Sequence, residues 1–155
     1  MLTEADERAL GRIAVWFARG VDSMPGSPDT AGAIGWLRRG FAEDCRFEYR
    51  RADGELFANA VGLADFTAFG HAFMREKQYV FTLHQVSNVL IEEAGEALAR
   101  IESAVVAYHR RPDASQDVAI ARYLDEAVRT DGRWLCRQRL CRQLAFDNYA
   151  PAFPL

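Results

Sequence analysis

Three separate segments of the chain carry side chains that together can transfer protons. The carboxylate of Asp22 ends an amphipathic stretch, the phenol of Tyr49 lies in an alternating stretch, and the imidazole of His84 follows an apolar run. An imidazole can take a proton from carbon, a carboxylate can orient that ring, and a phenol can donate a hydrogen bond to a substrate oxygen. We therefore treat the three as catalytic candidates. Such a set needs no metal and no cofactor, and we expect neither.

Each candidate also has a purely structural interpretation. A carboxylate at a helix C-terminus faces the negative end of the helix dipole, which costs up to about 1 kcal/mol and favours a functional reason for Asp22. Alternatively, Asp22 only begins a polar loop. His84 is alternatively a core histidine bonded to a backbone carbonyl, and Tyr49 a core tyrosine. The three form a site only if the fold brings them into one cavity.

Helical periodicity predicts three helices in the first half of the chain. Thr3 is a suitable N-cap for the first helix, which runs to Asp22 with its apolar residues on one face. Thr30 is placed to cap a second helix, and the third covers residues 63–76. The alternating residues of Asp44–Arg50 predict a strand between the second and third helices.

In the second half the apolar period changes to two, which is typical of strands. Asp131–Gly132 is a strong hairpin signal between the last two strands. The predicted strands are Tyr79–Leu83, Ser87–Glu92, Ala97–Arg110, Val118–Thr130 and Arg133–Leu144.

This order of elements predicts an α+β domain, with three helices packed on one face of a curved, mixed or antiparallel, cone-shaped sheet. The 155 residues are expected to form a single domain, with a core at about 4–146 and a tail at 147–155. The tail is apolar, so we expect it to reach a neighbouring subunit or to cover the pocket. Strands this long must bend, and a bent sheet under helices leaves a cavity suited to small ligands.

The composition argues against several classes of function. The chain has 19 Lys and Arg against 22 Asp and Glu, a net charge of −3, so we expect no nucleic-acid partner. Its three histidines lack metal-binding spacing, so no metal site is predicted. Its three cysteines lack CxxC spacing, which is typical of a reducing cytoplasm. No apolar run approaches the roughly 20 residues that cross a bilayer, so we expect no membrane partner.

Aromatic residues are expected to line the cavity and to bind a hydrophobic substrate. A guanidinium inside such a cone could bind an anionic or enolate oxygen, although arginines of a last strand more often lie at an interface or in solvent. His71 and His109 are interpreted as surface or structural residues. The candidate substrate-binding residues are Arg139, Phe17, Trp16, Phe69 and Tyr123.

The sequence resembles the SnoaL-like group of the nuclear transport factor 2-like superfamily over roughly residues 4–146. The resemblance depends on the order and spacing of several segments rather than on one specific motif. Those segments are the helix ending at Asp22, Phe47-Glu48-Tyr49, Leu83-His84-Gln85-Val86-Ser87-Asn88-Val89-Leu90-Ile91, Arg122-Tyr123-Leu124-Asp125, Asp131-Gly132-Arg133-Trp134 and Arg139.

Within that superfamily the chain is similar to cofactor-free lyases: scytalone dehydratase, hexachlorocyclohexane dehydrochlorinase and bile-acid 7α-dehydratase. These enzymes pair an aspartate at the end of the first helix with a histidine at the start of a strand, and Asp22 and His84 match those positions. Tyr49 matches an active-site tyrosine of the dehydratases. Scytalone dehydratase uses a second histidine, and the region taken to match it, near Ile120, contains none.

The resemblance implies a cofactor-independent lyase that performs a dehydratase-type β-elimination on a mid-sized hydrophobic cyclic or aromatic substrate. An isomerase, a cyclase or a retro-aldol lyase would use the same pair of residues. A non-catalytic small-molecule binder or the small subunit of an oxygenase would use the same fold. Relatives assemble as trimers or dimers, so a homo-oligomer is expected.

Overall fold

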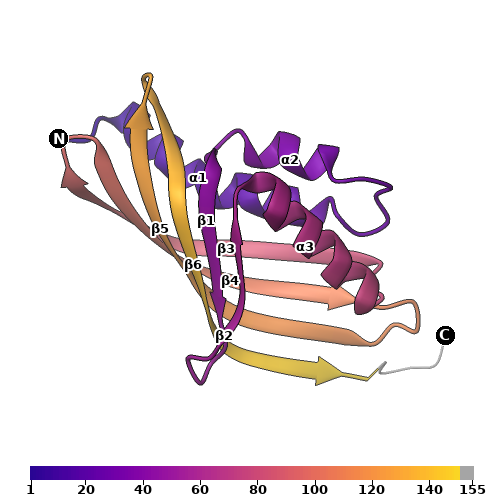
Figure 1. Cartoon of the computed structure of the whole chain (residues 1–155). Coiled ribbons are helices and arrows are strands. Elements are labelled where there is room, and N and C mark those ends of the chain that lie inside the picture. Colours follow the sequence, from indigo (N-terminus) through magenta and orange to yellow (C-terminus); the bar gives the residue numbers. More distant parts are fainter. Residues whose placement is uncertain (151–155) are drawn as a thin grey trace.

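A strongly curved sheet carries three helices on one side (Figure 1). The structure, a computed structural model, describes residues 1–150. The helices are α1 (Glu4–Asp22), α2 (Ala31–Leu37) and α3 (Leu63–Glu76). The strands are β1 (Phe41–Arg50), β2 (Leu56–Val61), β3 (Phe81–Gly95), β4 (Leu98–Arg110), β5 (Gln116–Thr130) and β6 (Arg133–Tyr149). This arrangement confirms the predicted α+β class with a cone-shaped sheet.

The six strands lie in the order β2-β1-β6-β5-β4-β3. All neighbours are antiparallel except β1 and β6, which run parallel, so the sheet is mixed. The Asp131–Gly132 hairpin joins β5 to β6, and both turn residues have positive φ angles, of 50° and 75°. A two-residue turn of that kind matches the twist of the strands that it connects.

Helix α1 begins with a reciprocal cap. The hydroxyl of Thr3 accepts a hydrogen bond from the Asp6 amide at 3.2 Å, and the Asp6 carboxylate accepts one from the Thr3 amide at 3.0 Å. The Asp6 carboxylate also accepts a hydrogen bond from the indole of Trp134 on β6, at 2.8 Å. These contacts fix the start of α1 against the sheet, and therefore also fix where its last residue, Asp22, lies.

The predicted cap of α2 is wrong. The Thr30 side chain makes no capping hydrogen bond, because its backbone is already helical, at φ −90° and ψ −6°. Instead, the carboxylate of Asp29 accepts a hydrogen bond from the amide of Ala31 at 2.9 Å. The helix forms as predicted, but its first free amide is satisfied from one residue earlier in the chain.

Two of the predicted strands are one strand. The segments 79–83 and 87–92 join in β3, where the pairing with β4 shifts between Ser87 and Leu90. Asn88 has a left-handed φ of 51° at this bulge. A bulge interrupts the alternation of side chains without ending the strand, and the sequence pattern therefore resembled a gap.

Strand β2 was not predicted. Its apolar residues Leu56, Phe57 and Val61 are exposed at the edge of the sheet, so it lacks the clean alternation of a strand with one buried face.

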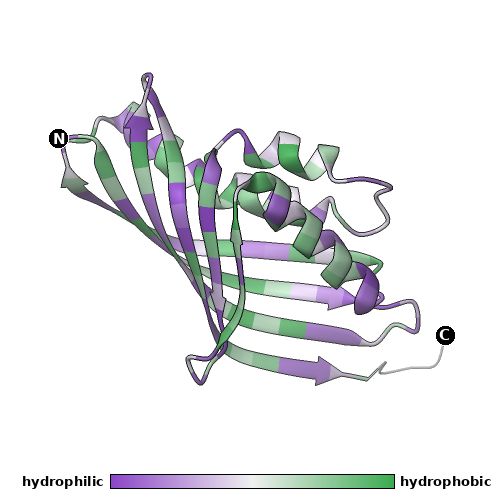
Figure 2. Ribbon diagram, in the orientation of Figure 1, coloured by the Kyte–Doolittle hydropathy of each residue, from purple (hydrophilic) through white to green (hydrophobic). Residues whose placement is uncertain are grey.

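Figure 2 shows mixed hydrophobic and hydrophilic residues along the long strands β3–β6. Within residues 1–150, no helix is both long enough and apolar enough to span a membrane. The predicted role of the tail from residue 151 lies outside the described residues.

Candidate active site

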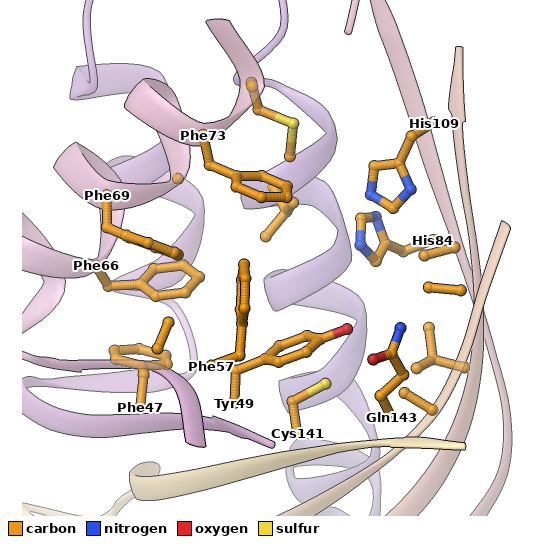
Figure 3. Close-up of a pocket in the computed structure, with 18 of the residues that line it drawn as sticks. Phe47, Tyr49, Phe57, Phe66, Phe69, Phe73, His84, His109, Cys141 and Gln143 are labelled. Carbon is orange, nitrogen blue, oxygen red and sulfur yellow. The ribbon is translucent and has the colours of Figure 1, made fainter. Parts of the chain in front are cut away.

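A cavity of about 650 Å³ lies between the sheet and the helices α1 and α3. Small inward-facing residues of β4 and β5 form its floor, because Ala107 pairs with Ala119 and neither side chain fills the space above. Phenylalanine side chains cover the other side, as Figure 3 shows for Phe66, Phe69 and Phe73 of α3. The cavity is therefore apolar and aromatic over most of its surface.

His84 lines one wall of this cavity, and Asp22, which does not itself line the cavity, binds the His84 ring. Nδ1 of His84 lies 2.6 Å from Oδ1 of Asp22, although the residues are 62 positions apart in the chain. The His84 side chain is 8% exposed and that of Asp22 is 22% exposed, so the pair is largely withdrawn from solvent. With Nδ1 held by the carboxylate, Nε2 is the ring nitrogen that remains to accept a proton.

Two further hydrogen bonds hold the Asp22 carboxylate in place. The Thr82 hydroxyl donates to Oδ1 at 3.1 Å, and the His84 backbone amide donates to Oδ2, also at 3.1 Å. Both donors lie at the start of β3, so these hydrogen bonds hold the end of α1 against the first residues of that strand. The donors stabilise a carboxylate that the helix dipole alone would disfavour.

His109 on β4 is a second histidine at the cavity, and because it is buried, its interpretation as a surface residue is wrong. It pairs with Thr82 across the β3–β4 ladder, which places its ring edge to face with that of His84, at a centroid distance of 5.5 Å. Burial, followed by the neighbouring His84, lowers the pKa of His109 to about 4. At neutral pH His109 is therefore an uncharged imidazole. His109 lies on β4, whereas the sequence comparison predicts the position of a second histidine near Ile120, on the adjacent strand β5.

Asp117 on β5 anchors the end of the cavity beside His109. The two residues pair across the β4–β5 ladder, and Asp117 is buried. Its carboxylate accepts hydrogen bonds from the Tyr79 hydroxyl, the Arg111 guanidinium and the Asn148 amide. Burial alone would raise the pKa of Asp117, but these hydrogen bonds lower it, so the carboxylate is charged. Its oxygens are already bound by donors from within the protein.

Tyr49 points its hydroxyl into the cavity (Figure 3). The residue lies on β1 and pairs with Cys141 of β6. Among residues 1–150 its hydroxyl makes no hydrogen bond with the protein, and burial raises its pKa above the ordinary value. The hydroxyl therefore stays protonated and is available to donate a hydrogen bond to a ligand oxygen.

Of the aromatic residues predicted to bind the substrate, Phe17, Phe69 and Tyr123 line the cavity and Trp16 does not. Adjacent residues of a helix point about 100° apart, so Trp16 turns away from the cavity that Phe17 faces. Trp16 instead stacks on Trp36, with ring centroids 5.9 Å apart.

Arg139 reaches the base of the cavity, but its charge is already paired. Its Nε and Nη2 atoms lie 2.7 and 2.5 Å from the two carboxylate oxygens of Asp125. Its guanidinium carbon lies 4.2 Å from the ring centroids of both Phe17 and Tyr123. The arginine is 1% exposed. The expectation of a free cation for substrate binding is therefore corrected to a buried ion pair enclosed by aromatic rings.

A curved sheet that closes an apolar cavity under three helices defines the class of nuclear transport factor 2-like domains. The chain belongs to the SnoaL-like domain family, whose sequence pattern matches residues 6–139. A comparison with curated protein sequences finds no significant match.

Several solved structures share this fold. A candidate scytalone dehydratase from Novosphingobium aromaticivorans is 23% identical, with 97% of this chain and 95% of that chain covered and a TM-score of 0.69. The hexachlorocyclohexane dehydrochlorinase LinA-type3 from Novosphingobium barchaimii is 16% identical, with coverages of 97% and 94% and a TM-score of 0.74. The β subunit of a candidate aromatic-ring-hydroxylating dioxygenase from Novosphingobium aromaticivorans is 13% identical, with coverages of 92% and 91% and a TM-score of 0.70. The TM-scores establish a common fold with these structures.

Proposed function

We propose that the protein is a cofactor-independent lyase that eliminates water from a mid-sized hydrophobic cyclic or aromatic substrate. The observation that carries this proposal is the 2.6 Å contact between His84 and Asp22 at the wall of an aromatic cavity. A histidine with a bound carboxylate is a competent base, because the carboxylate fixes the ring and stabilises the imidazolium that forms. The solved structures with names of lyases support the proposal through their shared fold.

In the proposed reaction, Nε2 of His84 removes a proton from a substrate carbon. The electron pair of that C–H bond forms a double bond to the neighbouring carbon, whose C–O bond breaks. The leaving hydroxyl takes a proton from the imidazolium of His84 and departs as water, which returns the base to its starting state. Tyr49 donates a hydrogen bond to the leaving oxygen or to an activating carbonyl, where charge develops. His109, uncharged and beside His84, offers a second neutral hydrogen-bonding group.

The same base and oxygen-binding groups suit isomerisation, cyclisation and retro-aldol cleavage. The fold alone suits a non-catalytic binder or an oxygenase small subunit, which is how the dioxygenase β subunit with this fold is named. The lyase is preferred because a binder would have no need for a carboxylate that orients a buried histidine. We further propose a homo-oligomer in the cytoplasm, with a small hydrophobic molecule as its ligand.

The direct test is the dehydration of 3-hydroxy-3,4-dihydronaphthalen-1-one to 1-naphthol and water, followed by ultraviolet absorbance. Wild type is expected to accelerate the reaction, and His84→Ala to lose at least about a hundredfold of that rate. His71→Asn changes a histidine that does not line the cavity and is the matched control. Exchange of the α-protons of 1-tetralone in D₂O measures proton abstraction alone. Failure of wild type in both assays, or full activity of His84→Ala, would contradict the lyase and favour the binder or the subunit.

A further inference from the structure

Gln143 on β6 is a buried polar residue whose side-chain amide makes no hydrogen bond with residues 1–150. The residue is 9% exposed and lines the cavity. Figure 3 shows its amide directed into the cavity, on the side of Tyr49 and Cys141. Among residues 1–150 its side chain makes no hydrogen bond, and its amide atoms are not among those sealed within the protein. They therefore face the space that a ligand would occupy.

A bulge on β6 determines the direction in which the Gln143 side chain points. The pairing of β5 with β6 shifts at this point, because Gln143 opposes Ala121 while Ala145 opposes the adjacent Ile120. The shift is a bulge on β6, and bulges re-aim a side chain within a sheet. Gln143 follows Cys141 on the same inward face, and Cys141 is the residue that pairs with Tyr49. The Gln143 amide and the Tyr49 hydroxyl consequently serve neighbouring parts of one cavity.

An amide placed in an apolar cavity without a partner is costly. When an apolar ligand covers such a group and leaves it unpaired, the cost is on the order of 1–3 kcal/mol, and a leucine or methionine at this position would avoid that cost. The surrounding floor, formed by Val105, Ala119 and Ala121, offers no hydrogen-bonding side chain. The neighbouring Arg139 is committed to Asp125. The amide is therefore left for a group that enters from outside.

The register also sets the distance over which a ligand must extend. Gln143 lies on β6 and His84 on β3, with β5 and β4 between them. In a flat sheet, three strand spacings would separate the two backbones by roughly 14 Å. Both side chains point into the cavity, so the distance between their polar ends is shorter than the distance between the backbones. The space that remains above the alanine floor suits one or two fused rings. A flat ring on this floor would have one edge at His84 and the opposite edge at Gln143.

We propose that Gln143 determines substrate specificity by hydrogen-bonding a ring hydroxyl or carbonyl oxygen on the edge of the substrate opposite the proton that His84 removes. A glutamine amide both donates and accepts, so it recognises either kind of oxygen. The site therefore takes oxygenated cyclic molecules and disfavours unsubstituted hydrocarbon rings, whose binding would leave the amide unpaired. Only the orientation toward His84 rests on the proposed function; the recognition of oxygen does not.

The test compares two probes that differ by one oxygen, 2-naphthol and naphthalene, with their binding measured by equilibrium dialysis. Wild type is expected to bind 2-naphthol about tenfold or more tightly than naphthalene, the effect of one satisfied hydrogen bond. Gln143→Met should abolish this preference and leave the affinity for naphthalene equal or higher. Gln85→Met, which changes an exposed glutamine of β3, is the matched control and should retain the preference. A preference that survives in Gln143→Met, or that is absent in wild type, would overturn the inference.

A second measurement uses only the wild-type protein, so it does not depend on the folding of a variant. In the wild-type protein, both probes should shift the side-chain ¹⁵N–¹H resonances of Gln143 through their ring currents, but 2-naphthol should add a shift from the hydrogen bond that naphthalene cannot produce. Equal shifts with both probes would also overturn the inference. Because binding involves no proton transfer, these results are independent of the turnover of His84→Ala. A wild-type protein that dehydrates its substrate but shows no oxygen preference would refute the role of Gln143 alone. A wild-type protein that shows the preference but no dehydration would refute the lyase alone.

Discussion

The imidazole rings of His84 and His109 meet edge to face, with their centroids 5.5 Å apart. Their environments differ sharply. Nδ1 of His84 is bound to the Asp22 carboxylate, whereas Nδ1 of His109 is enclosed and has no partner within residues 1–150. A nearby carboxylate favours the charged imidazolium, and burial without a partner disfavours it. Of these two neighbouring histidines, His84 is the one with a carboxylate partner, and His109 is the one that burial keeps neutral.

Replacing Asp22 with asparagine should separate charge from shape. Asparagine keeps an oxygen for the Thr82 hydroxyl but loses the acceptor for the His84 backbone amide, and it cannot stabilise the His84 imidazolium. The loss of one hydrogen bond should leave the fold intact. We expect the rate of dehydration to fall by about 10²–10⁴-fold, with an unchanged circular dichroism spectrum. Asp29→Asn, in the loop that follows α1, serves as the control and should keep its activity. Wild-type turnover in Asp22→Asn would exclude a role for the carboxylate.

The low pKa of His109 predicts a specific loss of stability in acid. The unfolded chain takes up a proton at this residue near pH 6.5, whereas the folded protein does so only near pH 4. The unfolded state thus binds more protons between these values, so stability falls as pH decreases from 6.5 to 4. The shift corresponds to roughly 3 kcal/mol over that window.

Urea unfolding of wild type and His109→Gln at pH 7 and pH 4 measures this contribution. Glutamine cannot be protonated, so the variant should lose roughly 2–3 kcal/mol less than wild type on acidification. Because both proteins carry the same other titratable groups, their difference isolates His109. Equal losses in the two proteins would show that the histidine is charged or solvated in the fold.

The sequence predicted which side chains could do chemistry better than it predicted which of them face one another. Asp22 and His84 were paired through a family resemblance, since the hydrogen bond across 62 positions is not visible in local patterns. His109 was missed although Ile101 and Val105 share its phase in β4 and are buried. That phase, extended to the strand end, would have placed His109 inward. Its position beside His84 depends on the β3–β4 register, which no local pattern specifies.

A bulge also changes which residues of β6 face inward. On β6 the inward phase changes between Cys136 and Arg139, where the pairing with β5 shifts. A strict alternation from Leu135 would place Arg137 on the same face as Arg139, whereas Arg137 is exposed and donates to Glu126. A one-residue irregularity moves every later side chain to the opposite face, and only the pairing of strands reveals where it lies.

The buried pair of Arg139 and Asp125 should behave as a structural unit rather than as a ligand site. Removing one partner leaves an uncompensated buried charge, so Arg139→Met should lower the free energy of unfolding by about 3–5 kcal/mol. The double variant Arg139→Met/Asp125→Leu should recover most of that loss, because both charges are gone. Chemical denaturation of the two variants measures the difference. A double variant no more stable than the single one would contradict this account.

Tyr49 should contribute to turnover and hardly at all to stability. Its hydroxyl has no partner within residues 1–150, so Tyr49→Phe should change the free energy of unfolding by less than about 0.5 kcal/mol. Loss of a hydrogen bond to a developing charge should reduce the dehydration rate by about 10–100-fold. Tyr108→Phe, on the opposite face of the sheet, is the control for both measurements. A large loss of stability in Tyr49→Phe, with normal turnover, would make this tyrosine structural.

The alanine floor should limit the size of the ligand. Ala119 lies in the inward row of β5, paired with Ala107, and the cavity exists partly because neither side chain is larger. Ala119→Ile adds a β-branched side chain, which strands accommodate well, but fills the space where a ring would lie. We expect binding of 2-naphthol to weaken at least about tenfold while thermal unfolding stays cooperative, since overpacking costs about 1–3 kcal/mol at most sites. Ala104→Ile places the same side chain on the outer face of β4 and should leave binding unchanged. If Ala119→Ile binds the probe as tightly as wild type, the ligand does not lie on this floor.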